Sequence, residues 1–237
     1  MIENQIGNKD IKILAHDIKN IFNNISSSIE LSKIFSSDST NNIKVAEQFN
    51  IINGQIARGI QLISNVRILS EFSELSRAKT NLDVLNKLKN AIILVKKVFQ
   101  DKTVNVNVNS FSKTIFATVD ELISEMFENL LFNAILHNMN TNVDIVIKIT
   151  KEQKGNDSFL KFGFTDNGIG VSDNRKEWIF EESLKKNKTG KGMGFGLTLV
   201  KKIIEKYGGF IWVEDRVKGD YSQGTNFVVL LPSGIEK

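Results

Sequence analysis

The sequence has no cysteine and only one proline among its 237 residues. The absence of cysteine excludes a disulfide framework and a thiolate metal site, and it is typical of proteins in a reducing compartment. The single proline, Pro232, leaves long segments free to form helices. No apolar run approaches the roughly 20 residues of a membrane span, and the N-terminal MIENQIGNKD lacks the apolar centre of a signal peptide. We therefore expect a cytoplasmic protein with no membrane span in this chain.

The charge balance is mildly basic, with a net charge of +4 that comes from lysines spread along the chain. Lysines in this arrangement favour weak attraction to acidic partners and do not indicate nucleic-acid binding. A hydrophobic content of 41% is ordinary for a globular protein. The length allows one large or two modest domains, each with its own core.

Helical periodicity dominates the first third of the chain. Between Asp10 and about Ile34, isoleucine, leucine and phenylalanine fall on one side of a helix, whereas His16 faces the opposite, polar side with Asn20. Turn and capping residues follow, and a second amphipathic helix is predicted to run to about Phe72. A lone hairpin cannot cover both apolar stripes, so pairing with a second copy as a four-helix bundle is expected. The sequence therefore predicts a homodimer.

The pattern changes after the polar segment from Ser73 to Thr80, which we interpret as a linker. Helices are predicted over Leu82 to Phe99 and from Asp120 to about His137. Strand candidates lie at 104–108, 115–119, 143–149, 159–164, 210–214 and 226–231. This mixture predicts an α+β sandwich, a mixed sheet with helices on one face. We expect two domains, residues 1–77 and 81–237.

A glycine-rich segment leads into another predicted helix. Gly190, Gly192, Gly194 and Gly196 alternate with larger residues, and Leu197 opens a stretch with helical apolar spacing. Glycines let the backbone approach a ligand closely, and the first amides of a helix suit a polyphosphate. A plain lid or connection has the same pattern, so this segment alone leaves both open.

Three further groups carry polar chemistry. Glu125, Asn129, Asn133 and His137 recur every four residues on one helix face, where asparagine oxygens could bind hydrated Mg²⁺ or the face could simply be solvated. Asp166 follows a strand and precedes Gly168 and Gly170, so its carboxylate could accept a hydrogen bond from the exocyclic amine of a base. Gly224 and Thr225 precede the last strand, where a hydroxyl can bond.

Taken in order, these segments resemble the nucleotide-binding boxes of the sensor histidine kinases. The matching segments are NLLFNAILHN (129–138), DNGIG (166–170), GMGFGL (192–197) and GT (224–225), and AHDIKN (15–20) resembles the phosphoacceptor box of that family. Related ATP-binding domains occur in gyrase, the mismatch-repair ATPases and the heat-shock chaperone. The resemblance covers about Ile11 to Pro232. It implies a dimerisation and phosphoacceptor hairpin followed by an ATP-binding domain.

The resemblance also implies a role for each matching residue. His16 would accept the γ-phosphoryl group of ATP with Asp17 as general base, and Asn20 matches a position that helps remove phosphate from the response regulator. Asn133 would bind Mg²⁺, supported by Asn129, and Asp166 would recognise the adenine amine. The remaining candidates would shape the base pocket or contact phosphate: Gly168, Gly170 and Thr225 in the pocket, and Gly190, Gly192, Gly194, Gly196, Leu197 and His137 near the phosphates.

Departures from the family pattern leave alternatives open. Leu136 stands where many of these kinases have a lysine, and His137 could supply part of that phosphate contact. An ATPase of the same superfamily would use a glutamate where this chain has Asn129, although Glu125 and Glu128 lie nearby. A noncatalytic dimeric phosphotransfer or scaffold protein is the other alternative. About ten residues precede the first helix, so input is expected from a separate sensor partner or from a longer protein.

Overall fold

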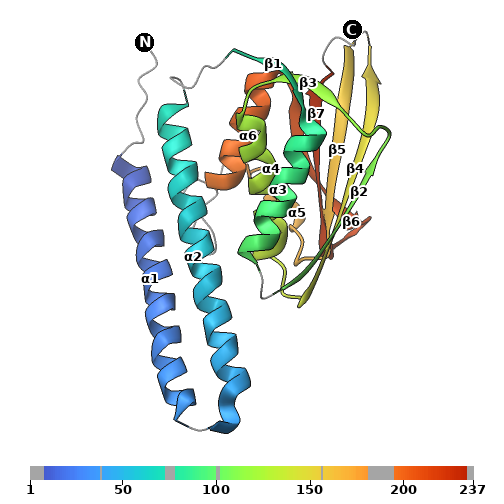
Figure 1. Cartoon of the computed structure of the whole chain (residues 1–237). Coiled ribbons are helices and arrows are strands. Elements are labelled where there is room, and N and C mark those ends of the chain that lie inside the picture. Colours follow the sequence, from blue (N-terminus) through green and yellow to red (C-terminus); the bar gives the residue numbers. More distant parts are fainter. Residues whose placement is uncertain are drawn as a thin grey trace. The chain divides into compact units, whose positions relative to one another are not determined.

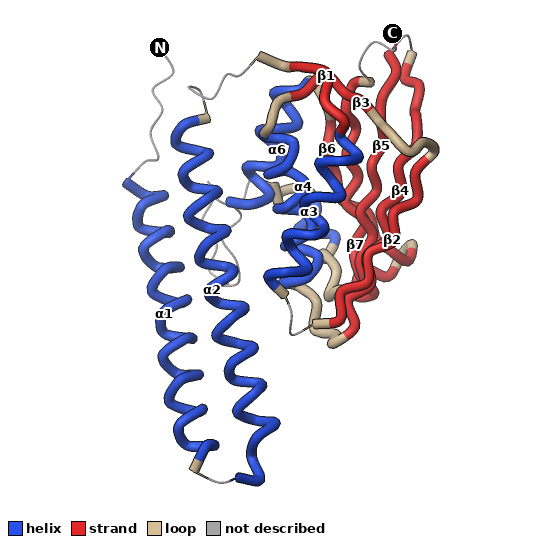
Figure 2. Tube along the Cα trace, viewed as in Figure 1, coloured by secondary structure: helices blue, strands red, loops and turns tan. Residues whose placement is uncertain are grey.

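The computed structural model describes residues 8–37, 39–72, 78–99, 102–155, 157–180 and 195–233. These residues form two compact units, a helical hairpin and a larger unit that carries the sheets. Figure 1 labels the elements of both units, and in Figure 2 the strands, in red, form a layer separate from the helices that cover it. Each unit is described by itself below.

The hairpin consists of α1 (Asn8–Ser36), a short 3₁₀ turn η1 (Ser39–Asn41) and α2 (Asn42–Glu71). The two long helices run alongside each other and bury Ile21, Ala57, Leu62 and Ile68. The predicted hairpin is therefore confirmed, with α1 extending two residues beyond each predicted end.

Many apolar side chains of the hairpin nevertheless remain at its surface in the single chain. More than 40% of the surface is exposed in each of Phe22, Ile29, Leu31, Ile34, Ile43, Phe49, Ile51, Ile56, Ile60 and Ile63. Several of these belong to the stripes that the sequence assigns to a buried face. Apolar surface of this kind favours association, and the four-helix bundle with a second copy stays a prediction.

The larger unit is built on a five-stranded sheet with strand order β2-β4-β5-β7-β6. The strands are β2 (Thr103–Ser110), β4 (Asn142–Lys154), β5 (Asp157–Asp166), β7 (Asp220–Pro232) and β6 (Phe210–Val217). β2 runs parallel to β4, and the other neighbours are antiparallel, so the sheet is mixed as predicted. A second, two-stranded sheet pairs β1 (Thr80–Asp83) with β3 (Phe116–Val119).

Helices cover one face of the five-stranded sheet (Figure 1). They are α3 (Val84–Val98), α4 (Leu122–Leu136) and α6 (Phe195–Tyr207). The core lies beneath them because alternate residues of β4, from Val143 to Ile149, are fully buried. The ring of Phe127 on α4 packs 5.7 Å from that of Phe162 on β5. The predicted α+β sandwich is confirmed.

Two local predictions need correction. Thr80 belongs to β1 rather than to a linker, and the helix predicted from Leu82 begins only at Val84. Asp83 fixes that start, because its carboxylate accepts hydrogen bonds from the backbone amides of Leu85 and Asn86 in the first turn of the helix. The short helix α5 (Asp173–Lys176) was not predicted, since four residues show no periodicity.

Helices α4 and α6 are joined through a buried carboxylate. Asp120, just before α4, accepts hydrogen bonds from Tyr207 Oη at 2.5 Å and Lys206 Nζ at 2.7 Å, both at the end of α6. Burial alone would raise the pKa of Asp120, but the hydrogen bonds from Lys206, Tyr207 and the amide of Leu122 outweigh it and lower the pKa. The ionised carboxylate therefore holds α6 against the start of α4.

Among the described residues, every helix is too short or too polar to cross a membrane.

Candidate functional site

The best-defined candidate site centres on Asp166, at the end of β5. Its side chain is buried, with 5% of the residue exposed. One carboxylate oxygen, Oδ1, accepts a hydrogen bond from the amide of Gly168 at 2.7 Å, and the other, Oδ2, accepts one from the Thr225 hydroxyl. Burial raises the pKa of Asp166, while these hydrogen bonds and the charge of Arg216 act in the opposite direction. The sequence-predicted partners Asp166, Gly168 and Thr225 thus meet in one place.

Glycines allow the chain to pack tightly around this carboxylate. Gly170 has a φ of +71°, and a Cβ there would lie 1.5 Å from the carbonyl oxygen of Tyr221. A Cβ on Gly224, which has a φ of +118°, would lie 2.0 Å from the carbonyl oxygen of Asp166. Both positions require glycine because of conformation and space. The two loops can therefore meet at Asp166 only with these residues.

The loop after Asp166 is anchored by asparagines that the sequence analysis did not single out. Asn167 Oδ1 accepts hydrogen bonds from Asn138 Nδ2 at 2.6 Å and from the amide of Asp144 at 3.0 Å. Lys102 donates to the carbonyl oxygens of Ile135 and Asn138 at the end of α4. Asn138 and Asn167 lie inside matched boxes, which was the only sequence signal for them, and Lys102 had none.

The asparagine side chains of α4 do not lie on a fully solvent-exposed helix face. Asn129 is 2% exposed, and its Nδ2 donates to the carbonyl oxygen of Glu125 at 2.9 Å. The interpretation of this face as merely solvated is therefore wrong for Asn129. Asn133 Nδ2 is buried and has no hydrogen-bond partner among the described residues. His137 ends α4 with its side chain exposed.

The buried Nδ2 atom of Asn133, which has no hydrogen-bond partner among the described residues, allows a test of whether the site fits a metal ion. The described residues contain no group of three or more carboxylate or imidazole side chains that could hold a metal alone. Mg²⁺ that accompanies a polyphosphate does not need such a group, because water and phosphate oxygens supply most of its ligands. The oxygen and nitrogen of an amide are interchangeable in shape. Asn133 therefore fits the part of a single protein ligand to such an ion.

A carboxyl pair lies on the same helix as these asparagines. Burial raises the pKa of Glu128 to about 7, and the negative charge of Glu125 one turn earlier adds to the effect. Glu128 is therefore partly protonated near neutral pH.

The glycine-rich segment lies mostly outside the described residues, which include neither Gly190, Gly192 nor Gly194. Gly196 and Leu197 belong to the first turn of α6, and Leu197 is buried. Thr198 Oγ1 donates to the carbonyl oxygen of Phe180 at 3.1 Å. The start of α6 is thus fixed beside the end of the chain segment that precedes the glycines.

The candidate phosphoacceptor lies in the hairpin unit, on α1. The His16 side chain is 63% exposed, as predicted, whereas that of Asp17 is only 11% exposed. Asp17 Oδ1 lies 3.2 Å from Nδ1 of His16, and Asn20 Nδ2 lies 3.2 Å from the same nitrogen. The three residues that the sequence placed together are therefore in contact around one imidazole ring.

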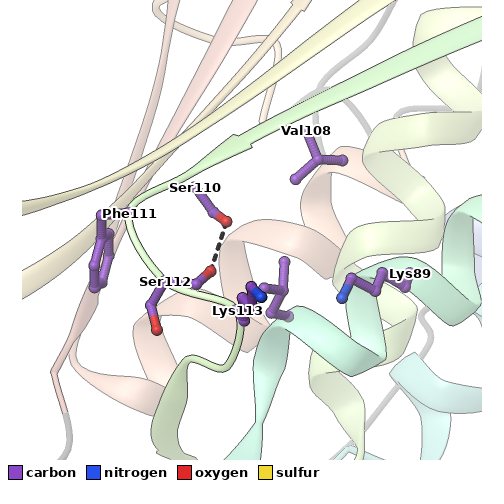
Figure 3. Close-up of a pocket in the computed structure, with 7 residues that line it drawn as sticks. Lys89, Val108, Ser110, Phe111, Ser112 and Lys113 are labelled. Carbon is purple, nitrogen blue, oxygen red and sulfur yellow. Dashed lines mark hydrogen bonds between the residues drawn. The ribbon is translucent and has the colours of Figure 1, made fainter.

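A separate cavity of about 420 Å³ lies between α3 and the loop after β2 (Figure 3). Its lining includes Lys89, Ser110, Phe111, Ser112 and Lys113, and Ser110 Oγ donates to the carbonyl oxygen of Ser112. β2 begins beside Asn142, near the Asp166 loop, and this cavity lies at its other end. The cavity is an open surface groove and shares no residue with the predicted nucleotide boxes.

Comparison with known sequences gives a consistent result. Residues 118–235 match the family of histidine kinase-, DNA gyrase B- and HSP90-like ATPases. The adaptive-response sensory kinase SasA of Synechocystis is 27% identical over 96% of this chain and 60% of its own length. The autoinducer 2 sensor kinase/phosphatase LuxQ of Vibrio vulnificus is 24% identical over 92% of this chain, which spans 26% of that relative. The chain thus corresponds to part of these relatives.

Solved structures show the same fold. A mycobacterial sensor histidine kinase, MprB, aligns with a TM-score of 0.55 at 20% identity, over 65% of this chain and 97% of its own. Full-length ShkA in complex with AMPPNP aligns with a TM-score of 0.58 at 18% identity, over 95% of this chain and 46% of its own. The chain therefore has the catalytic core of a sensor histidine kinase, a helical hairpin followed by a histidine kinase-, gyrase B- and HSP90-like ATP-binding domain.

Proposed function

We propose that the chain is an ATP-dependent protein histidine kinase that phosphorylates its own His16 and transfers the phosphoryl group to an aspartate of a response regulator. The observation that carries this proposal is the exposed imidazole of His16 with the Asp17 carboxylate 3.2 Å from Nδ1. An exposed neutral imidazole is a competent nucleophile when a neighbouring base takes up its other proton. Membership of the histidine kinase family supports the same conclusion.

The positions of the two ring nitrogens define the first chemical step. A proton on Nδ1, donated to Asp17, leaves the lone pair on Nε2, which attacks the γ-phosphorus of ATP. The N–P bond forms as the bond from the γ-phosphorus to the β–γ bridging oxygen breaks, and ADP leaves with that electron pair. The Nδ1 proton passes to Asp17, so the phosphorylated ring stays neutral.

The second unit would hold the nucleotide in this reaction. Asp166 would accept a hydrogen bond from the adenine amine, because its buried carboxylate is already fixed by Gly168 and Thr225. Asn133 would contact Mg²⁺, which when bound would offset the charge of the phosphates. The AMPPNP complex of ShkA supports nucleotide binding by this fold.

Phosphatase activity toward the regulator extends the proposal. Asn20 lies one turn after His16 on the exposed side of α1, where it could orient a water molecule at a docked acyl phosphate. The name of the relative LuxQ, a sensor kinase/phosphatase, supports this extension. The proposal requires three partners. They are the response regulator, a second copy of the chain in a homodimer, and a sensor protein or sensor domain.

An ATPase of the same superfamily is the second candidate. The observation that favours an ATPase is the raised pKa of Glu128, which is about 7. Glu128 adjoins Asn129, and a carboxyl group with such a pKa could activate water. Asn129 itself cannot act as a base, since an amide has no basic lone pair to accept a proton. A noncatalytic scaffold is disfavoured by the intact contacts around Asp166.

The ratio of protein labelling to phosphate release tests the proposal against the ATPase. The full chain would be incubated with γ-labelled ATP and Mg²⁺, and both products would be measured over time. A kinase labels the protein toward one phosphoryl group per chain with little free phosphate. Sustained phosphate release over many turnovers without label on the protein would identify the ATPase instead.

A further inference from the structure

Two neighbouring side chains, one a hydrogen-bond acceptor and the other a donor, lie next to the same atom of His16. Asp17 Oδ1 and Asn20 Nδ2 each lie 3.2 Å from Nδ1. A carboxylate oxygen can only accept a hydrogen bond, and an amide nitrogen can only donate one. Nδ1 carries either a proton or an in-plane lone pair, so it can satisfy only one of the two neighbours at a time.

The state of the ring decides which neighbour is satisfied. Before phosphoryl transfer, the nucleophilic form has its proton on Nδ1, and this form hydrogen-bonds to Asp17. After transfer, Nε2 carries the phosphoryl group and the Nδ1 proton has passed to Asp17. Nδ1 then has a lone pair, and once Asp17 has released the proton to water its carboxylate can again only accept, so Asn20 is the neighbour that donates to Nδ1.

We propose that Asn20 is a positioning residue for the phosphorylated form of His16, and that Asp17 and Asn20 hold Nδ1 in turn before and after transfer. This inference rests on the proposed function, because it takes His16 as the phosphoacceptor. A donor at Nδ1 occupies the lone pair that a proton would otherwise take. Protonation would turn the ring into a better leaving group, so the Asn20 contact prolongs the life of the phosphoryl group on His16.

In the unphosphorylated chain the same contact has a second consequence. Asn20 stabilises the tautomer with the proton on Nε2, which cannot attack phosphorus, in competition with Asp17. Removal of Asn20 therefore shifts the tautomer ratio toward the form with the proton on Nδ1. One neutral hydrogen bond corresponds to about a fivefold shift in this ratio.

The test uses the full chain and two measurements on each variant. Nitrogen chemical shifts of the imidazole report the tautomer ratio, and the chain contains only two histidines, so the His16 signals can be assigned. The half-life of the phosphoryl group on purified, nucleotide-free protein reports the second effect. The variants are Asn20→Ala and, as a matched control, Asn23→Ala, because Asn23 is exposed on the same helix and does not hydrogen-bond to His16.

Asn20→Ala is expected to raise the share of the Nδ1–H tautomer and to shorten the phosphoryl half-life, each by about fivefold. Asn23→Ala should change neither quantity. An Asn20→Ala protein with unchanged tautomer ratio and half-life, or with a shift toward the Nε2–H tautomer, would overturn the inference. If no variant is labelled on His16 while the tautomer still shifts, the contact is correct and the proposed function fails.

Discussion

At the scale of single residues, Asp166 is the group that we propose to recognise adenine. Its two oxygens are held by the amide of Gly168 and the hydroxyl of Thr225, so the carboxylate cannot rotate freely. A fixed acceptor in a buried position discriminates strongly for a ligand amine, because a mismatched buried group loses its hydrogen bond without replacement by water. The same enclosure raises the pKa of Asp166.

Asp166→Asn is expected to weaken ATP binding by about 10- to 150-fold, the equivalent of one charge-assisted hydrogen bond. The new amide can still accept from Gly168 through its oxygen, but its NH₂ group would face the adenine amine, donor against donor. Calorimetric titration with ATP measures the affinity. Asp173→Asn, at an exposed carboxylate, is the control. Wild-type affinity in a folded Asp166→Asn protein would remove the assignment.

Glu128 gives a pH-dependent prediction at the same scale. Its pKa is raised from 4.5 to about 7 by burial and by Glu125, so the folded state holds this proton more tightly than the unfolded state. Its contribution to stability is therefore full below pH 4.5 and is lost as the pH rises to about 7. Glu128→Gln should raise the free energy of unfolding by about 1 kcal/mol at pH 8 and by little at pH 4.5, measured by urea denaturation. Equal gains at both pH values would refute the raised pKa.

At the scale of elements, α4 is the helix on which the larger, sheet-containing unit depends. It packs between the sheet and α3, it carries Asn129 and Asn133, and its end supports the Asp166 loop. Its start is tied to α6 through Asp120, Lys206 and Tyr207. A buried ion pair therefore holds the end of α6 against the start of α4.

Asp120→Asn is expected to destabilise the chain by about 2 to 3 kcal/mol, because it removes the buried negative charge to which Lys206 and Tyr207 hydrogen-bond. The pKa of Asp120 is lowered, so its contribution is present above the usual pKa of an aspartate and is lost as the pH falls through the folded value. The free energy of unfolding at pH 7 measures the cost. Asp173→Asn removes an exposed ion pair and should cost less than about 1 kcal/mol. Equal losses in the two variants would contradict the account.

The resemblance to a known family identified the boxes around Asp166, and sequence periodicity was sufficient for the long elements. It missed β1, whose four residues show no alternation, and it could not show the Asp120 network, whose partners are 86 and 87 residues apart. It predicted the exposure of His16 because that exposure depends on the angular position of the residue around its own helix. The burial of Asn129 could not be predicted in the same way, because it depends on which elements cover α4.

At the scale of the whole molecule, the exposed apolar residues of the hairpin are the feature that a single chain leaves unexplained. Phe22 and Ile60 are each 65% exposed, one on each long helix. Apolar surface of this kind contributes about 25 cal/mol per Å² when it is buried against a partner. A second copy of the hairpin would supply a matching surface and complete a four-helix bundle.

We therefore expect the wild-type chain to sediment as a dimer at micromolar concentration and the double variant Phe22→Asp/Ile60→Glu to sediment as a monomer. The charges would have to be buried in the bundle without partners. Sedimentation equilibrium on the full chain measures the mass. Phe111→Asp, at an exposed apolar residue of the other unit, should leave the dimer intact. A monomeric wild-type chain would exclude the bundle.

The central claim, that His16 receives the phosphoryl group of ATP, is tested most directly by locating the label. The full chain and His16→Gln would be incubated with ATP and Mg²⁺, and the phosphorylated residue would be identified by mass spectrometry under non-acidic conditions. We expect phosphate on His16 in the wild type, and no phosphorylation in His16→Gln although its affinity for ATP is unchanged. Phosphorylation of His16→Gln at the wild-type level, or phosphate found on His137 instead, would contradict the account.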